Sequence, residues 1–232
     1  MDGGVPTVFI VDDAREVRNA LSRMLCAAGY PVRSFESAER FLQEQDSNEP
    51  GCLLLDVCLP GLSGIDLQRE LTGSPIARPI IFLTGMGDIQ TSVLAMKAGA
   101  VDFLTKPIDN VRLYAAIDQA LRLDAGRRLE QAIRCSVERR IASLTPRERQ
   151  VMSLVVRGRL NKQIAADLGT GEKTIKVHRA RVMAKMRARS VAQLVRLGSR
   201  AGIAVEPLGM AQIRPLFAMA PTASELSSLL SI

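Results

Sequence analysis

The sequence predicts a doubly wound α/β domain joined by a long helix to an all-α, four-helix helix-turn-helix domain. Five short apolar runs alternate with helical patterns in the first half of the chain. A capped helix start and a tight glycine turn follow in the second half. Residues 1–124 hold 11 basic and 17 acidic side chains, whereas residues 125–232 hold 20 basic and 7 acidic ones. This division predicts an acidic module followed by a module that binds a polyanion.

The apolar runs are the expected strands of a five-stranded parallel sheet: Thr7–Val11, Val32–Phe35, Cys52–Asp56, Pro79–Thr84 and Val101–Leu104. Helices are expected at Arg15–Ala28, Ala38–Gln45, Gly64–Leu71, Asp88–Ala98 and from Asn110 onward. Strands that alternate with helices form parallel sheets covered on both faces. With the strand order 2-1-3-4-5, the first and third strands are neighbours, and a ligand is expected beyond their carboxyl ends.

Polar residues stand at the carboxyl ends of four of these strands. Asp12 and Asp13 follow the first strand, Asp56 ends the third, Thr84 ends the fourth, and Lys106 follows the fifth. Three crowded carboxylates need a counter-charge, and a set of hard oxygen ligands suits Mg²⁺. One aspartate can then act as a nucleophile toward phosphorus, while a lysine and a hydroxyl stabilise the phosphoryl oxygens.

These residues, with LPGLSG at 59–64 and DFLTKP at 102–107, resemble the receiver domain of two-component response regulators over residues 5–123. The resemblance implies that Asp56 accepts a phosphoryl group from a sensor histidine kinase. It also implies that Mg²⁺ is bound directly by Asp13 and by the backbone carbonyl of Cys58, and largely through water by Asp12. Thr84 and Phe103 correspond to a pair of switch residues, and Lys106 to the phosphoryl-binding lysine.

A long helix is expected between the two modules, because residues 110–143 contain no proline and only Gly126 interrupts the helical pattern. We take residues 1–124 as the receiver domain and 125–142 as an extended linker helix. An apolar stripe runs along it through Leu113, Ile117, Leu121, Leu129, Ile133, Val137 and Ile141. Self-association through this helix is one hypothesis, and the pairs Arg127-Arg128 and Arg139-Arg140 are expected to be solvated.

The second module, residues 143–204, begins with a strong helix start. In the string LTPRE at 144–148, Thr145 is the expected N-cap, proline takes the first helical position, and Glu148 completes a capping box. This helix is expected to reach Arg157-Gly158. Three further helices are expected: one capped by Asn161 and running through Leu168, one over Glu172–Met186, and one over Ser190–Arg200.

The helix over 172–186 has one apolar and one basic face. At 100° per residue, Ile175, Val182 and Met186 share the inward face. The opposite face carries small and basic residues, which lets a helix enter a major groove. That face and its flanks comprise Lys173, Thr174, Lys176, Val177, Ala180, Arg181, Ala184 and Lys185. With 14 basic and 3 acidic side chains over residues 143–200, phosphate neutralisation should contribute much of the affinity.

The strings LTPRE at 144–148, NKQIA at 161–165 and KTIKVH at 173–178 resemble the LuxR-type helix-turn-helix of the FixJ/NarL class over residues 143–198. The resemblance implies that Lys176, Val177 and nearby outward residues meet base edges. It also implies phosphate contacts by Lys162, Thr174, His178 and Arg179. For His178, a packing role remains an equal alternative. Some relatives carry a lysine in place of Ala180, so base contacts cannot be transferred wholesale.

Together these features predict a cytoplasmic transcriptional response regulator that binds DNA when Mg²⁺-dependent phosphorylation of Asp56 makes it a homodimer. It is not expected to be an enzyme beyond its own phosphoryl transfer and dephosphorylation. One alternative is a regulator that binds DNA without phosphorylation and uses the receiver as a dimer scaffold. Another is a Mg²⁺-dependent phosphohydrolase, which Cys58 disfavours, because the haloacid dehalogenase family has an acid at that position.

Three further expectations concern the chain as a whole. No run of eighteen apolar residues predicts a membrane span, and the first residues lack the layout of a signal peptide. Cys26, Cys52, Cys58 and Cys135 show no metal-binding spacing and are expected to be reduced. Residues 205–232 fall outside both resemblances, and Thr222–Glu225 could open a short terminal helix.

Overall fold

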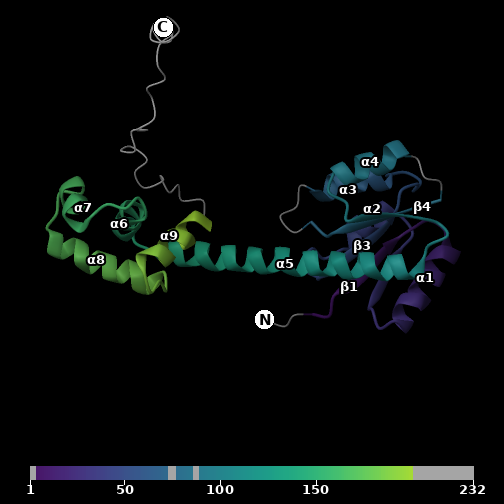
Figure 1. The fold of residues 1–232 in the computed structure, drawn as a ribbon, viewed down its shortest axis with the longest axis horizontal. Helices are drawn as coiled ribbons and strands as arrows, with labels where there is room; N and C mark the ends of the chain where they lie inside the picture. The colour runs from purple at the N-terminus through teal and green to yellow at the C-terminus, as the bar shows by residue number, and fades with distance from the viewer. Residues whose placement is uncertain (1–3, 73–76, 86–88, 201–232) are drawn as a thin grey trace, which may run out of the picture. The chain divides into compact units, whose positions relative to one another are not determined.

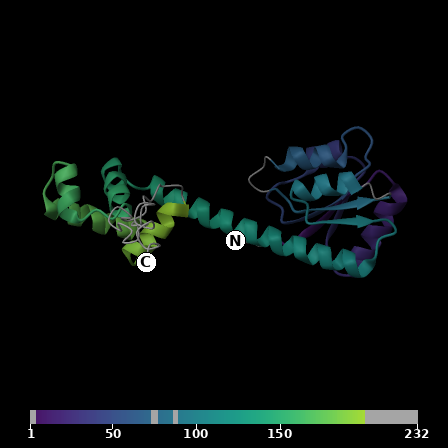
Figure 2. The same cartoon turned by 45° about the horizontal axis from the view of Figure 1, so that its top comes forward.

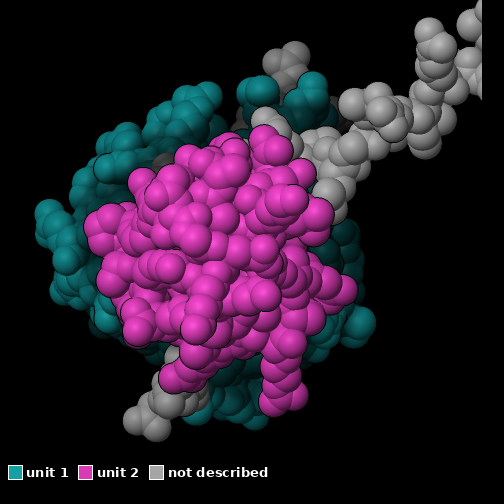
Figure 3. All heavy atoms as spheres, turned by 90° about the vertical axis from the view of Figure 1, so that its left-hand side faces the viewer, with its two compact units in different colours: residues 1–132 teal, residues 133–232 magenta. Residues whose placement is uncertain are grey.

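The computed structural model describes residues 4–72, 77–85 and 89–200. Contacts between residues divide the chain into two units, 1–132 and 133–232 (Figure 3), and the boundary lies inside one helix. The segment 205–232, including the expected helix start at Thr222–Glu225, lies outside the described residues. Each unit has its own apolar core and is described separately.

The first unit is a five-stranded parallel sheet in the order β2-β1-β3-β4-β5, which confirms the predicted order. The strands are β1 (Thr7–Val11), β2 (Val32–Phe35), β3 (Gly51–Asp56), β4 (Ile80–Thr84) and β5 (Asp102–Thr105). The helices between and after them are α1 (Arg15–Ala27), α2 (Ala38–Glu44), α3 (Gly64–Thr72), α4 (Ile89–Lys97) and α5 (Asn110–Ala142). All bounds lie within one or two residues of those expected wherever an end was predicted.

Helices cover both faces of this sheet (Figures 1 and 2). Successive side chains of a strand point to opposite faces. In β1, Phe9 and Val11 therefore join one core, with side chains of α2, α3 and α4, while Val8 and Ile10 join the other, with side chains of α1 and α5. β1, β3 and β4 are buried on both faces. Continuous apolar runs, rather than alternating ones, are the expected result.

Helix α5 belongs to both units. Leu113 and Ile117 are fully buried in the core of the first unit, and Leu121 packs against it. Farther along, Ile133, Val137 and Ile141 pack into the core of the second unit. Leu129, between these groups, is 64% exposed. The predicted apolar stripe is therefore divided between two cores.

The expectation that Arg127 and Arg128 are solvated is wrong for Arg128, whereas Arg127 is exposed. Arg127 donates a hydrogen bond to the carbonyl oxygen of Ala77 at 3.1 Å. Arg128 bonds Asp124 Oδ2 at 2.7 Å and three carbonyl oxygens of the segment before β3, those of Ser47, Asn48 and Glu49. Asp124 is almost fully buried, and its Oδ2 also accepts from the backbone N–H of Gly51 at 2.9 Å.

Replacing Arg128 with glutamine should therefore destabilise the first unit by about 2 kcal/mol, because it strips the cation from a buried carboxylate. The matched control is Arg69→Gln, which removes an exposed pair with Asp66 and should change stability by under about 1 kcal/mol. Urea unfolding of the full chain measures both. Equal effects of the two substitutions would contradict a structural role for Arg128.

In the described part of the second unit, residues 133–200, four helices pack around one apolar core, to which the end of α5 also contributes. They are α6 (Pro146–Val156), α7 (Asn161–Asp167), α8 (Glu172–Lys185) and α9 (Val191–Arg200). The predicted capping box is confirmed, since Glu148 N donates to Thr145 Oγ1 and Thr145 N donates to Glu148 Oε2. The predicted N-cap of the second of these helices is wrong: Leu160 holds that position and Asn161 is the first helical residue.

Candidate functional site

The acidic residues singled out from the sequence meet at the carboxyl edge of the sheet. Asp12, Asp13 and Asp56 each offer a carboxylate oxygen, and these oxygens all lie within 4.8 Å of one another. β1 and β3 are hydrogen-bonded neighbours, with Val11 opposite Leu55, so the residues that follow them are adjacent. Asp12 and Asp56 are buried, while Asp13 is exposed. The cluster therefore has one open side.

Lys106 supplies the counter-charge. Its Nζ donates to Asp12 Oδ2 and to Asp56 Oδ2, each at 2.6 Å. The segment that carries it is held next to β4, because Lys106 N donates to the carbonyl oxygen of Thr84 at 2.7 Å. The Lys106–Pro107 peptide bond is cis. With all groups ionised, three carboxylates and one ammonium leave a net charge of −2, which a single divalent cation would balance.

The surroundings shift the proton affinities of this pair in identifiable ways. Burial raises the pKa of the Asp12 carboxyl, while the hydrogen bond and charge of Lys106 oppose that rise. Burial by itself would lower the pKa of the Lys106 ammonium, but its hydrogen bonds to Asp12 and Asp56 raise it above the usual value. Lys106 is therefore charged at neutral pH and is available to an anionic group at this site.

Backbone groups fix the remaining oxygens of the two buried carboxylates. Asp12 Oδ1 accepts from Ala14 N at 2.9 Å, and Asp56 Oδ1 accepts from Cys58 N at 3.0 Å. Gly64, in the LPGLSG string, lies against the backbone of Asp56: a Cβ there would be 2.2 Å from the Asp56 carbonyl oxygen. Only glycine allows this close approach. The string thus holds α3 against the end of β3.

The donor set suits Mg²⁺. Hard carboxylate oxygens are its preferred protein ligands, and it is usually held by one or two carboxylates together with water and phosphate oxygens. Asp12, Asp13 and Asp56 supply such oxygens from three separate backbone positions. The turn at Cys58 is held beside Asp56, but the role of its carbonyl as a ligand stays a prediction.

The two expected switch residues lie on neighbouring strands. Thr84 is 2% exposed at the end of β4. Phe103, on β5, is half-buried and pairs in register with Phe82, with ring centroids 6.1 Å apart. Thr84 therefore lies at the edge of the sheet that carries Lys106, whereas Phe103 lies two register positions farther into the sheet.

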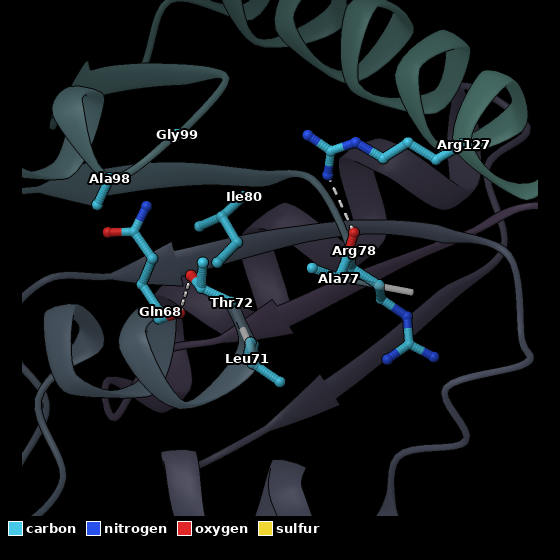
Figure 4. Close-up of a pocket in the computed structure, with 9 residues that line it drawn as sticks. All are labelled: Gln68, Leu71, Thr72, Ala77, Arg78, Ile80, Ala98, Gly99 and Arg127. Carbon is cyan, nitrogen blue, oxygen red and sulfur yellow. Dashed lines mark hydrogen bonds between the residues drawn. The ribbon is translucent and has the colours of Figure 1, made fainter. Parts of the chain in front are cut away.

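A cavity of about 310 Å³ lies near the opposite end of β4 (Figure 4). Ile80 begins β4 and lines this cavity, whereas the acidic cluster lies near Thr84, where β4 ends. In Figure 4, Arg127 reaches over the cavity to the carbonyl oxygen of Ala77. The cavity therefore does not contain the acidic site, and its lining is otherwise Gln68, Leu71, Thr72, Arg78, Ala98 and Gly99.

The second candidate site is the outward face of α8. Ile175, Val182 and Met186 are fully buried, which confirms the predicted inward stripe. Most of the predicted DNA-contacting side chains are exposed, namely Lys162, Lys173, Thr174, Lys176, Val177, Arg181 and Lys185. Val177 is 47% exposed, although it is apolar. A basic helix face with small side chains fits the major groove.

Two residues of the predicted set are half-buried rather than exposed. Arg179 is half-buried and donates to Asn161 Oδ1 at 2.8 Å, which ties α8 to α7. His178 is also half-buried, and its Nδ1 is buried with no hydrogen-bond partner. This environment fits the packing alternative for His178 at least as well as a phosphate contact.

Lys185, which was also predicted to contact DNA, pairs with α6. Its Nζ donates to Glu148 Oε2 at 2.6 Å and to the carbonyl oxygen of Ser143 at 3.1 Å. The hydrogen bonds from Lys185 and from the Thr145 N–H lower the pKa of Glu148 to about 2. The ammonium of Lys185 therefore joins α8 to α6 and the segment before it. Its predicted contact with DNA stays a prediction.

A pH dependence follows from this pair. Glu148 has its usual pKa of 4.5 in the unfolded chain and about 2 in the folded one, so its stabilising contribution is complete above about pH 4.5 and is lost as the pH falls toward 2. Lys185→Met should lower the unfolding temperature at pH 7 and reduce its dependence on pH between 4.5 and 2. Calorimetry of the full chain measures this, with Lys176→Met as the control for an exposed lysine.

Comparison with known proteins decides the family. The Response regulator receiver domain family matches residues 8–118, and the family described as Bacterial regulatory proteins, luxR family, matches residues 142–197. Nodulation protein W of Bradyrhizobium diazoefficiens is 44% identical over 206 residues, which cover 89% of this chain and 91% of that protein. The chain belongs to the two-component response regulators with a LuxR-type DNA-binding domain.

Other relatives resemble this response regulator along most of its length. Transcriptional regulatory protein FixJ of the same organism is 41% identical over 196 residues, covering 84% of this chain and 96% of that protein. Among solved structures, response regulator StyR is 46% identical, with a TM-score of 0.76, and the match covers 85% of this chain and all of that chain. Within the described residues of this response regulator, no helix is long and apolar enough to cross a membrane.

Several interactions at the acidic cluster and in the LuxR-type domain were not predicted from the sequence. Arg18 donates to the carbonyl oxygens of both Asp12 and Asp13. Lys106 was assigned to the phosphoryl group, yet here it joins two of the acids directly. The Glu148–Lys185 pair spans 37 positions, so no local spacing rule indicates it.

Proposed function

We propose that this response regulator is switched by Mg²⁺-dependent transfer of a phosphoryl group from a histidine kinase to Asp56. The observation that supports this most directly is the meeting of Asp12, Asp13, Asp56 and Lys106 at one edge of the sheet. The proposed Mg²⁺ ligands are Asp13, Asp56, the Cys58 carbonyl and, largely through water, Asp12. The remaining proposal is that the regulator acts in the cytoplasm and catalyses only its own phosphoryl transfer and dephosphorylation.

The proposed chemistry is an in-line displacement at phosphorus. A carboxylate oxygen of Asp56 forms the new P–O bond while the bond between phosphorus and the kinase imidazole breaks and its electrons return to the imidazole. Mg²⁺ supplies charge neutralisation for the acids and the phosphoryl oxygens when bound. The Lys106 ammonium, already in contact with Asp56, can then bind a phosphoryl oxygen.

The proposed switch uses Thr84 and Phe103. The hydroxyl of Thr84 turns toward the phosphoryl group, and the ring of Phe103 fills the space that it leaves. The burial of Thr84 and the partial burial of Phe103 on adjacent strands support this step, because a small displacement in a packed core favours one of two arrangements. The new charge on Asp56 biases that equilibrium.

The proposed output is dimerisation and binding to two DNA half-sites about one helical turn apart. An apolar surface on α4 and the start of α5 supports self-association, since Val93, Leu94, Met96 and Val111 are all exposed. In the second unit, the proposed base-reading face consists of Lys173, Lys176, Val177 and Arg181. The proposed phosphate contacts are made by Lys162, Thr174, His178 and Arg179.

The test is intact mass and DNA binding after incubation with acetyl phosphate. With Mg²⁺, we expect one added phosphoryl group and tighter binding to a promoter fragment, and neither change when EDTA removes the metal. Equal DNA binding in all conditions would favour a constitutive dimer scaffold. Continuous release of phosphate from a small phosphate ester would instead indicate a phosphohydrolase.

A further inference from the structure

We propose that Arg18 is a positioning residue for the divalent-cation site, an inference that rests on the proposed function. Its Nη1 donates to the carbonyl oxygen of Asp12 at 2.7 Å and to that of Asp13 at 2.9 Å. One guanidinium nitrogen therefore joins the backbone of the two adjacent acids. Arg18 lies on the first turns of α1 and is half-buried.

The segment that Arg18 holds, Asp12 and Asp13, lies beyond the end of β1. The register of β1 with β2 and β3 ends at Val11. Beyond it, Asp12 N donates to the Phe35 carbonyl oxygen at 3.3 Å, a long contact. Carbonyl groups beyond the end of a ladder need other partners when they are shielded from water. Bonds from a charged donor are among the stronger ones, so Arg18 restricts this turn more than a neutral donor would.

Asp13 depends on this restraint more than the other two acids do. Asp12 and Asp56 each receive one backbone and one Lys106 hydrogen bond on their carboxylates. Among the residues that the structure describes, none donates a hydrogen bond to the Asp13 carboxylate. Its position is set by its own backbone, and Arg18 bonds the carbonyl of that backbone.

Arg18 also places positive charge where it does not compete with a metal. Lys106 occupies one carboxylate oxygen of Asp12 and one of Asp56. Arg18 bonds only carbonyl oxygens, so it offsets the repulsion between adjacent acids and leaves the Asp13 carboxylate open. Groups that orient metal ligands in this way typically change metal affinity by about 10- to 100-fold when they are removed.

The test compares full-length Arg18→Gln with Arg23→Gln, which removes the same charge from an exposed position farther along α1. Calorimetric titration with MgCl₂, without a phosphoryl donor, should show about tenfold weaker binding for Arg18→Gln and no change for Arg23→Gln. In acetyl phosphate reactions, Arg18→Gln should need about tenfold more Mg²⁺ for the half-maximal rate and recover near the wild-type rate at saturation. Arg18→Lys, which retains a cationic donor, should recover part of the affinity.

Failure of the inference and failure of the proposed function give different results. If wild type binds Mg²⁺ and becomes phosphorylated, and Arg18→Gln has the same Mg²⁺ affinity, Arg18 is not a positioning residue. A lower unfolding temperature with unchanged Mg²⁺ affinity would likewise overturn it. If wild type itself neither binds Mg²⁺ nor gains a phosphoryl group, the proposed function fails. Should Arg18→Gln not fold, Arg18→Met, which keeps the aliphatic stem and removes the donors, is compared with wild type instead, and equal Mg²⁺ affinities would overturn the inference.

Discussion

Replacing Asp56 with asparagine is expected to abolish the phosphorylated species and the stimulation of DNA binding by a phosphoryl donor. The amide retains an oxygen that can accept from Cys58 N, but it is not a nucleophile toward phosphorus. The change also removes one of three crowded negative charges, so the fold should not lose stability. Intact mass after incubation with acetyl phosphate and Mg²⁺, followed by a promoter-binding titration, measures both losses.

The matched control is Asp66→Asn, which removes the same charge from an exposed position on the first turn of α3. It should be phosphorylated like wild type. Donor-stimulated DNA binding by Asp56→Asn, or a phosphoryl group found on that variant, would contradict the assignment of Asp56. Unstimulated binding by Asp56→Asn should equal that of the unphosphorylated wild type, because the change leaves α8 untouched.

Replacing Val177 with glutamate is expected to weaken DNA binding by about 100-fold, which corresponds to about 2.7 kcal/mol. Val177 is 47% exposed on the outward face of α8, so the change should leave the fold intact. It replaces an apolar contact with a negative charge in the major groove, where the surrounding phosphates repel it. Fluorescence anisotropy with a promoter duplex measures the loss, and circular dichroism checks the helices.

Gln150→Glu provides the comparison, because it adds the same carboxylate to an exposed position on α6 of the same domain. Net charge falls equally in both variants, so any difference between them reports on location. If both variants lost DNA affinity to the same extent, α8 would not be the helix that enters the groove.

The parallel fold and the acidic cluster could be predicted because each depends on local order along the chain. Strands are marked by apolar runs, and parallel strands bring their carboxyl ends to one edge. Asp12, Asp56 and Lys106 could therefore be placed together from their positions at strand ends. Likewise, Ile175 and Val182 could be placed inward from helical periodicity alone.

Contacts made by long basic side chains could not be predicted in the same way. The reach of Arg18, Arg128 or Lys185 depends on which backbone carbonyls and carboxylates the tertiary fold brings near. One signal was present: Asp124 and Arg128 stand four residues apart on a helix, a spacing that favours an ion pair. Nothing local indicates that Arg128 also bonds the segment before β3.

The dual use of Glu148 has a consequence for how such domains are recognised. The same carboxylate closes the start of α6 and accepts from Lys185 in the last turn of α8. The LTPRE string is thus part of the scaffold of the domain, because its glutamate holds α8 in place against α6. Two regulators that share this string can therefore bind different promoters, because the proposed base contacts are made by the outward face of α8 and not by the string.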